Sequence, residues 1–268
     1  MKLKIAYFTI SIFTALSLLN TVSAVDSDPL STNEISLVKN MLEKLKPYID
    51  ERKSKGNLNL LGFEELYSKL DPSEKEFMVR IRNTKPLPQD QREPLFEPSA
   101  FVAINDQKLI IPDPTNPEKN YFSVIERQFL PKKVFEAYVQ MMNAMEKDLG
   151  KRLYVESGYR SPAYQLYLFV FYLQNHDYSI KETNRWVALP GFSEHGAPER
   201  QAIDFITREG ISGENHPEDF ENVPEYNWLT QNANRFGFVL SYPKNNTTNS
   251  AFEPWHWRYE PSPTQETK

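Results

Sequence analysis

Two histidines and two acidic residues in the C-terminal half of the chain could together form a metal-dependent hydrolytic site. They are His195, Asp204, Glu253 and His256. Two imidazoles and a carboxylate supply three of zinc's four tetrahedral positions and leave the fourth open for water. A glutamate beside that water could act as general base in a hydrolysis. The residue types therefore indicate a zinc hydrolase.

Each of these side chains also has an ordinary structural interpretation. A single histidine is more often a hydrogen-bonded residue of a packed region than a metal ligand. We expect such a structural role for His176 and assign no function to His216, which lies in a polar loop. Asp204 lies in an otherwise apolar stretch, where a buried carboxylate must be paired or bind a metal. Arg160 could pair with Asp204 in a metal-free protein, but zinc is the interpretation that we prefer.

The segment that carries Asp204 predicts a strand. Residues 201–206 alternate in the strand period, so that Asp204 shares one face with Ala202 and Ile206, while Ile203 and Phe205 lie on the other.

Further strands are expected over 153–155, 238–242 and 255–259. Pro254 lacks an N–H group and favours an extended residue before it, so Glu253 should lie just before the last strand. From there Glu253 and His256 can both reach one metal ion. The two tryptophans that flank His256 are expected to pack in the core.

Three helices are expected among these strands, over 131–149, 163–175 and 224–236. Gly150 and Gly237 stand where the first and third should end. Helices and short strands that do not alternate regularly indicate an α+β fold. We expect a small antiparallel sheet with flanking helices that bears the zinc site, preceded by a helical N-terminal region.

The N-terminal region carries two helix start signals. Residues 31–34 form a capping box followed by apolar residues at helical spacing, and Pro47 is expected to end or bend this helix near Lys46. A capping side chain at Asp71, followed by proline, predicts a second helix to about Arg82.

A proline-rich segment follows from 86 to 117. Within it, the apolar segments 101–104 and 109–111 flank Asn105 and Asp106, which predicts a short hairpin. The sequence leaves open whether this segment is a linker or an arm that lies on the main domain.

The start of the chain is typical of a secretory signal peptide. Lys2 and Lys4 precede a short apolar run, and cleavage is expected after Ala24. We therefore expect an exported protein, periplasmic or extracellular, with no membrane span after cleavage. The absence of cysteine excludes thiolate metal sites and a cysteine nucleophile. The net charge of -5 argues against nucleic acid as a partner.

Four motifs follow one another in the C-terminal half of the chain: Ser157-Gly158-Tyr159-Arg160-Ser161, Ser193-x-His195, Ala202-x-Asp204 and Glu253-x-Trp255-His256. In this order they resemble the zinc D-alanyl-D-alanine carboxypeptidases of the VanY type, which belong to the wider LAS-type group of peptidoglycan metallopeptidases. The resemblance covers roughly residues 128–259, and the segment 228–238 also fits it.

This resemblance implies a role for each motif. It implies that Glu253 is the catalytic base and that Arg160 and Ser193 contact the substrate. The planar guanidinium of Arg160 suits a carboxylate or a polarised carbonyl. The resemblance also implies a Zn²⁺ ion in an open groove above the sheet. The implied zinc ligands are His195, Asp204 and His256.

The spacing departs from the family pattern in one place. The family's aspartate follows the first histidine by seven positions, whereas Asp204 follows His195 by nine, and Arg200 stands where glycine is expected. Two extra residues within 196–199 must be absorbed by a turn, which proline and glycine allow. The ligand types are retained, so zinc binding is still expected, while the specificity of the groove stays open.

The expected activity is zinc-dependent cleavage of peptidoglycan stem peptides, with D-alanyl-D-alanine ends as the first candidate. The alternatives are an L,D-carboxypeptidase or endopeptidase of the same fold, and a non-catalytic cell-wall-binding protein. The longer loop motivates the last alternative, while the retained Glu253 counts against it.

Stem peptides are the expected partners, and a monomer is the expected state. The expected divisions are 1–24 signal peptide, 25–115 N-terminal region and arm, 116–262 peptidase domain and 263–268 tail.

Overall fold

The structure is a computed structural model that describes residues 28–84, 101–113, 115–197, 200–214, 216–246 and 251–260. The predicted signal peptide and the tail after 262 lie outside these ranges. Of the helices that the structure describes, none combines the length and the hydropathy that a membrane span requires.

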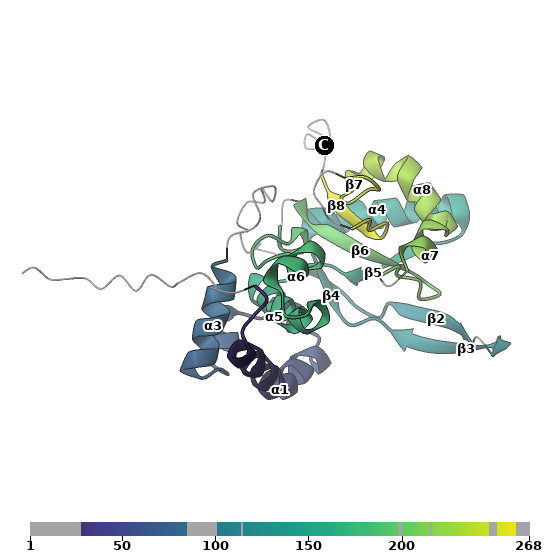
Figure 1. Cartoon of the computed structure of the whole chain (residues 1–268). Coiled ribbons are helices and arrows are strands. Elements are labelled where there is room, and N and C mark those ends of the chain that lie inside the picture. Colours follow the sequence, from purple (N-terminus) through teal and green to yellow (C-terminus); the bar gives the residue numbers. More distant parts are fainter. Residues whose placement is uncertain are drawn as a thin grey trace, which may run out of the picture.

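The N-terminal region is helical, as predicted. It contains α1 (Thr32–Ser54), α2 (Phe63–Tyr67) and α3 (Pro72–Arg82) (Figure 1). Both hydrogen bonds of the capping box between Ser31 and Glu34 are present at the start of α1. The helix predicted from Asp71 to about Arg82 is α3, which begins after Asp71 and ends at Arg82, so this prediction is confirmed.

Pro47 was expected to end or bend α1 near Lys46; it does not end the helix, which continues through Pro47 to Ser54. Leu45 and Ile49 lie on either side of the proline and are both buried. Their packing maintains the helix, and because Pro47 is exposed, water can reach the carbonyl group that its missing N–H leaves free.

These N-terminal helices share a hydrophobic core with two later helices, α5 (Pro162–Tyr172) and α6 (Ile180–Trp186). Met41 and Leu45 of α1, Phe77 of α3, and Leu166 and Phe169 of α5 are almost fully buried in it. The N-terminal helices therefore support α5, which follows directly on the Ser157–Ser161 motif.

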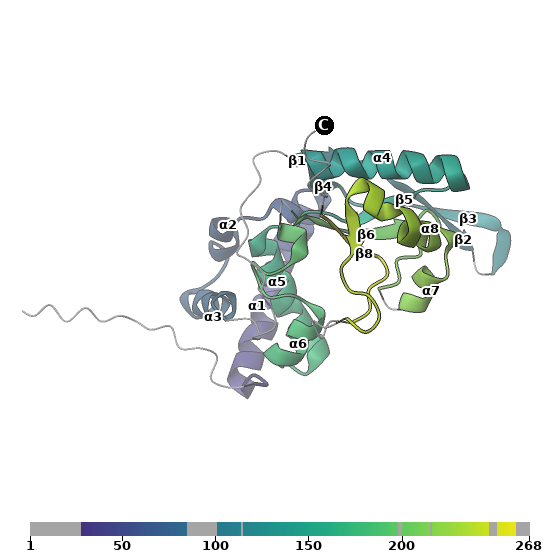
Figure 2. The same ribbon diagram turned by 90° about the horizontal axis from the view of Figure 1, so that it is seen from above.

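A second core lies under a four-stranded antiparallel sheet in the order β5-β6-β8-β7. Its strands are β5 (Leu153–Ser157), β6 (Ala202–Thr207), β7 (Phe238–Leu240) and β8 (His256–Tyr259). The helices α4 (Lys132–Leu149), α7 (Pro217–Glu221) and α8 (Pro224–Asn232) accompany the sheet (Figure 2). The predicted α+β class is confirmed.

Four further strands precede α4: β1 (Phe101–Ile104), β2 (Lys108–Asp113), β3 (Asn116–Val124) and β4 (Gln128–Pro131). The predicted hairpin between 101–104 and 109–111 is wrong, because β1 pairs with β4 and β2 pairs with β3. Between β1 and β2, the Gln107 side chain bonds both backbone groups of Val155 in β5, at 2.8 Å each. That docking holds the turn against β5, and the chain after it does not fold back along β1.

The β2–β3 hairpin projects from the body of the molecule (Figure 1). Several of its apolar side chains are exposed, and Phe122 is the most exposed of them at 75%.

Candidate metal and catalytic site

Asp204 occupies the centre of the site because of its position in the sheet. It lies on β6 directly opposite His256 of β8 and beside Ser157 of β5. Its neighbours Ile203 and Phe205 are buried in the core shared with α4. Since successive strand residues point to opposite faces, Asp204 points away from that core. The predicted alternation of this strand is thus confirmed.

His195 reaches the same place from outside the sheet, on a short 3-10 helix at Glu194–Gly196 that Ser193 caps. Its Nδ1 donates to the Gly158 carbonyl at 2.8 Å, and its own carbonyl accepts from the Arg160 N–H at 3.0 Å. Gly158 is required here, because a Cβ at this position would lie 2.5 Å from the Phe129 carbonyl oxygen. The Ser157–Ser161 motif therefore holds His195 through its backbone.

Three potential ligand atoms, one each from His195, Asp204 and His256, all lie within 4.8 Å of one another. His195 Nε2 lies 3.0 Å from Asp204 Oδ2, and His256 Nδ1 lies 2.7 Å from Asp204 Oδ1. The sheet and the Ser193-x-His195 turn thus bring together the three residues proposed from sequence, despite the two additional residues between His195 and Asp204.

The donor atoms fit a metal cation. His195 donates through Nδ1 to a carbonyl, which can only accept, so its Nε2 carries a lone pair in the neutral ring. That Nε2 is buried without a hydrogen-bond partner although a carboxylate oxygen lies 3.0 Å away. A lone pair facing a carboxylate is unfavourable unless a cation lies between them. His195, Asp204 and His256 could therefore hold a metal ion.

Burial and neighbouring charges shift the pKa values of the two histidines in opposite directions. Burial, together with the nearby Arg160 guanidinium, lowers the pKa of His195 to about 4. Burial also acts to lower the pKa of His256, but the carboxylates of Asp204 and Glu194 raise it to about 10. Burial alone would raise the pKa of Asp204, yet the two imidazoles hold it well below its usual range. A metal at His256 Nδ1 must therefore displace a proton.

Glu253 lies just before β8, where Pro254 was expected to hold it. Its Oε2 is 3.7 Å from Nδ1 of His256. Burial is the largest influence on this carboxyl group and raises its pKa to about 7. A carboxylate in such a position can accept and return a proton near neutral pH.

Arg160 and Ser193 both line the cleft that contains these residues. Nε of Arg160 is buried and without a hydrogen-bond partner. Arg160 and Asp204 form no ion pair, which removes the alternative weighed from sequence. Ser193 Oγ accepts from the His195 N–H at 3.3 Å, so this serine also has a structural role.

Sequence reasoning missed Glu194. Its Oε2 lies 3.0 Å from Nε2 of His256, and its other oxygen lies 3.9 Å from Arg258. Glu194 fixes the orientation of the second histidine, as carboxylates commonly do beside metal-binding imidazoles. The only signal in the sequence was its place as the middle residue of Ser193-x-His195.

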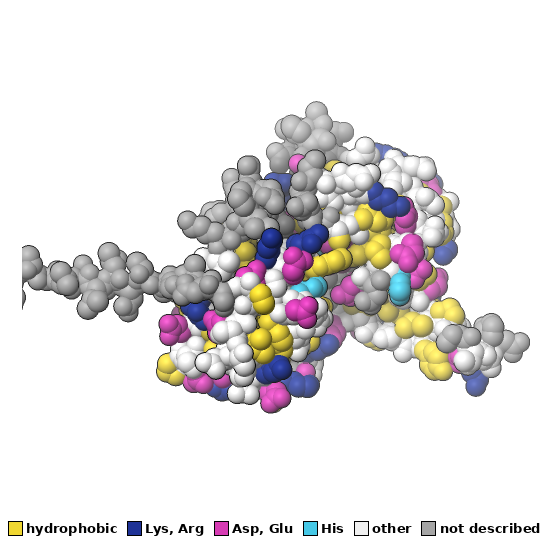
Figure 3. Space-filling view, viewed as in Figure 1, with side chains coloured by type: hydrophobic (Ala, Val, Ile, Leu, Met, Phe, Trp, Pro, Cys, Tyr) yellow, Lys and Arg dark blue, Asp and Glu magenta, His cyan; other side chains and the backbone are white. Residues whose placement is uncertain are grey.

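The cleft itself encloses about 730 Å³. It lies between the helical side, with α5 and α6, and the sheet, and hydrophobic, basic, acidic and histidine side chains all occur around it on the face shown in Figure 3. Glu156 also lines it, and burial, together with the charge of Asp204, raises the pKa of Glu156 to about 8.

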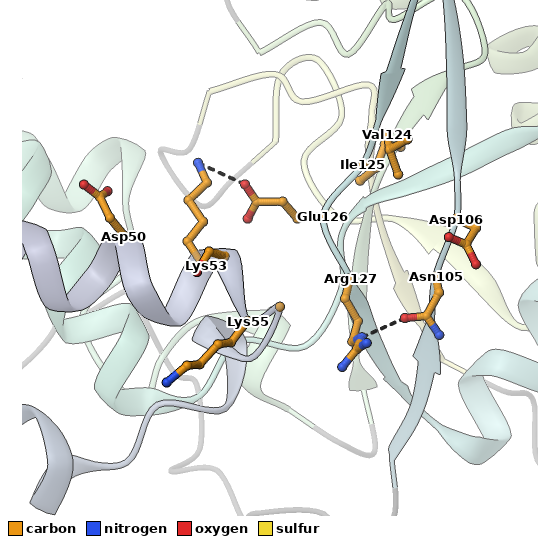
Figure 4. A pocket seen from close by; sticks show the side chains of 11 residues that line it. Asp50, Lys53, Lys55, Asn105, Asp106, Val124, Ile125, Glu126 and Arg127 are labelled. Carbon is orange, nitrogen blue, oxygen red and sulfur yellow. Dashed lines mark hydrogen bonds and ion pairs between the residues drawn. The ribbon is translucent and has the colours of Figure 1, made fainter.

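A second pocket, of about 570 Å³, shares no lining residue with the cleft. It lies between the end of α1 and the connections of β1–β2 and β3–β4 (Figure 4). Lys53 pairs with Glu126 at 3.1 Å, and Arg127 donates to Asn105 at 2.7 Å. Both basic side chains thus have a partner within the pocket, and we assign this pocket no function.

Comparison with known proteins finds similarity over the C-terminal half of the chain, which contains this site. A family model described as VanY, D-alanyl-D-alanine carboxypeptidase, matches residues 127–262. The Bacillus subtilis protein YodJ is 33% identical over 156 residues, 56% of this chain and 52% of YodJ. A D-alanyl-D-alanine carboxypeptidase of Enterococcus faecalis is 40% identical over 80 residues, 29% of this chain and 26% of that protein. The chain thus spans about half or less of these relatives.

Partial similarity also extends to solved structures. The structure of the LdcB LD-carboxypeptidase matches with 28% sequence identity and a TM-score of 0.46. The match covers 64% of this chain and 72% of the LdcB chain. A VanYB structure in complex with D-alanine-D-alanine has 26% identity and a TM-score of 0.41, over 58% of this chain and 86% of that one.

Proposed function

The chain belongs to the VanY family of D-alanyl-D-alanine carboxypeptidases, and on this premise we propose that it is a zinc-dependent peptidase that trims peptidoglycan stem peptides. The observation that carries the proposal is the convergence of ligand atoms from His195, Asp204 and His256 within 4.8 Å, beside the carboxylate of Glu253. Terminal D-alanyl-D-alanine is the proposed substrate, because two relatives carry that activity in their names.

Zinc is the proposed metal because two imidazoles and one carboxylate form a ligand set typical of catalytic zinc sites. A zinc ion held there would supply Lewis-acid chemistry, which polarises a carbonyl group and lowers the pKa of water.

The remaining chemistry belongs to side chains of the cleft. Glu253 takes a proton from the attacking water and returns it to the leaving amine, which its raised pKa allows. Arg160 presents a guanidinium whose buried Nε has no partner, and it binds the terminal carboxylate of the peptide or the developing oxyanion. The Ser193 hydroxyl accepts from the His195 N–H and retains its own proton to donate to the peptide.

The test is hydrolysis of purified muropeptides by the zinc-loaded protein, with products identified by mass. Loss of one alanine from pentapeptides is the expected result. Loss from tetrapeptides would instead define an L,D-carboxypeptidase, and monomers from dimers an endopeptidase. Chelation should abolish the activity, and added zinc should restore it. A zinc-bound wild-type protein that cleaves none of these substrates would contradict the peptidase and favour the cell-wall-binding alternative.

We further propose that the protein is exported and acts as a monomer on the periplasmic or outer side of the membrane. The proposal of export rests on the charged, then apolar start of the chain and on the location of its proposed substrate. Exported material should begin after Ala24, which mass spectrometry checks. A mature protein that retained Met1 would refute cleavage, and sedimentation at the mass of a dimer would refute the monomer.

A further inference from the structure

The cleft is large, and its lining differs in chemical character between the part around the proposed ligands and the part formed by α6. A volume of about 730 Å³ lies in the upper part of the range of small-molecule pockets, roughly 300–1,000 Å³. At the metal end the lining is charged. Another part of the lining, here called the far end, is formed by residues from α6 and from the 3-10 helix at Leu173–His176, two elements that carry none of the proposed ligands.

Trp186 is the most prominent residue of that far end. It closes α6 and is 60% exposed, whereas its neighbours Thr183 and Leu189 are buried. The apolar face of this short segment is therefore filled without Trp186. The indole ring instead lines the cleft, where a large apolar surface remains in contact with water.

The Trp186 ring is held in a defined orientation. It stacks on the imidazole of His176, with ring centroids 6.2 Å apart and planes only 6° from parallel. One side of the indole is thus supported by His176. Polar side chains from the same two elements also line the cleft: Asn175, Asn184 and Arg185. Arg185 pairs with Glu182 at 3.2 Å, and the Asn184 Oδ1 accepts from the Leu189 N–H at 3.2 Å, which leaves the Asn184 amide N–H groups and the other guanidinium N–H groups as donors.

A flat aromatic surface edged by amide and guanidinium groups matches one class of ligand. The C–H face of a pyranose ring stacks on an indole, while its hydroxyl and acetamido groups need hydrogen-bond partners at the edge. We propose that Trp186 and His176 form a saccharide subsite, which binds the N-acetylated sugar attached to the stem peptide while the peptide's C-terminus lies at the metal end. This inference rests on the proposed function.

The test compares two substrates that carry the same pentapeptide, one free and one attached to its disaccharide. In Trp186→Ala, the ratio of kcat/KM for the disaccharide substrate to that for the free peptide should fall about tenfold, which corresponds to about 1.4 kcal/mol. Trp186→Phe should retain most of the ratio because it keeps an aromatic face. Phe122→Ala removes an even more exposed aromatic outside the cleft and should leave the ratio at the wild-type value.

Equal losses on both substrates, or no loss on either, would overturn the saccharide subsite. If wild-type protein cleaves neither substrate, the proposed function fails, and binding decides the subsite separately. The free disaccharide, N-acetylglucosaminyl-N-acetylmuramic acid, is then titrated into intact protein by ligand-observed NMR. About tenfold weaker binding to Trp186→Ala supports the subsite, and unchanged binding or no binding to wild type refutes it.

Discussion

Glu194 and Asp204 hold the His256 imidazole from opposite sides: Glu194 Oε2 lies 3.0 Å from Nε2, and Asp204 Oδ1 lies 2.7 Å from Nδ1. The Nε2 contact directs Nδ1 toward the other two proposed ligands. We therefore propose Glu194 as a positioning residue that acts through the proposed ligand His256.

Removing the Glu194 carboxylate should weaken zinc binding without removing a ligand. We expect Glu194→Ala to lower zinc affinity by about 10–100-fold, the usual effect of losing such a supporting group. Glu194→Gln should have a smaller effect because its amide oxygen can still accept from Nε2–H. Competition with a chromophoric chelator measures the zinc affinity of both variants. The control is Glu214→Ala, which removes a cleft carboxylate that bonds neither histidine. Wild-type affinity in Glu194→Ala would contradict this role.

Loss of a proposed ligand should have a larger consequence. His256→Ala should no longer retain stoichiometric zinc after purification, because two remaining protein ligands seldom hold the ion. His176→Ala is the matched control, since this histidine lines the same cleft but stacks on Trp186. Metal content by mass spectrometry and folding by circular dichroism are measured together. Folded His256→Ala with full zinc content would refute the ligand set.

Glu253 should be separable from metal binding. Glu253→Gln removes the base but keeps the shape of the side chain, so zinc content and fold should match wild type. The rate should fall by about 10²–10⁴-fold, as is typical when a general base is lost. Alanine release from a pentapeptide measures this rate. Undiminished activity in a metal-loaded Glu253→Gln protein would show that another group accepts the proton.

Gly158 should be required for stability as well as for the site. Gly158→Ala would place a methyl group 2.5 Å from the Phe129 carbonyl oxygen, and the backbone would have to move. Such overpacking costs about 1–3 kcal/mol, measurable by urea denaturation. The movement also shifts the carbonyl that holds His195, so zinc affinity should fall too. Gly62→Ala is the control, because its methyl group would meet only the flexible Glu65 side chain, at 3.4 Å.

Local features of the chain were predictable because they depend on neighbours in sequence. The capping box at Ser31 and the capping side chain of Asp71 define where two helices start, and strand alternation predicts which face of the sheet carries Asp204. Residue chemistry alone also indicated the metal-binding group of His195, Asp204 and His256.

Other features depend on partners far away in the sequence, and only the tertiary structure decides them. The segments at 101–104 and 108–113 do not form a hairpin with each other, because Gln107 bonds to β5 and each strand finds another partner. Nothing local predicts that Glu194 meets His256, since the two residues come together only when the Ser193 turn folds over the sheet. Burial likewise arises only in the folded chain, and it is what raises the pKa of Glu253 toward neutrality.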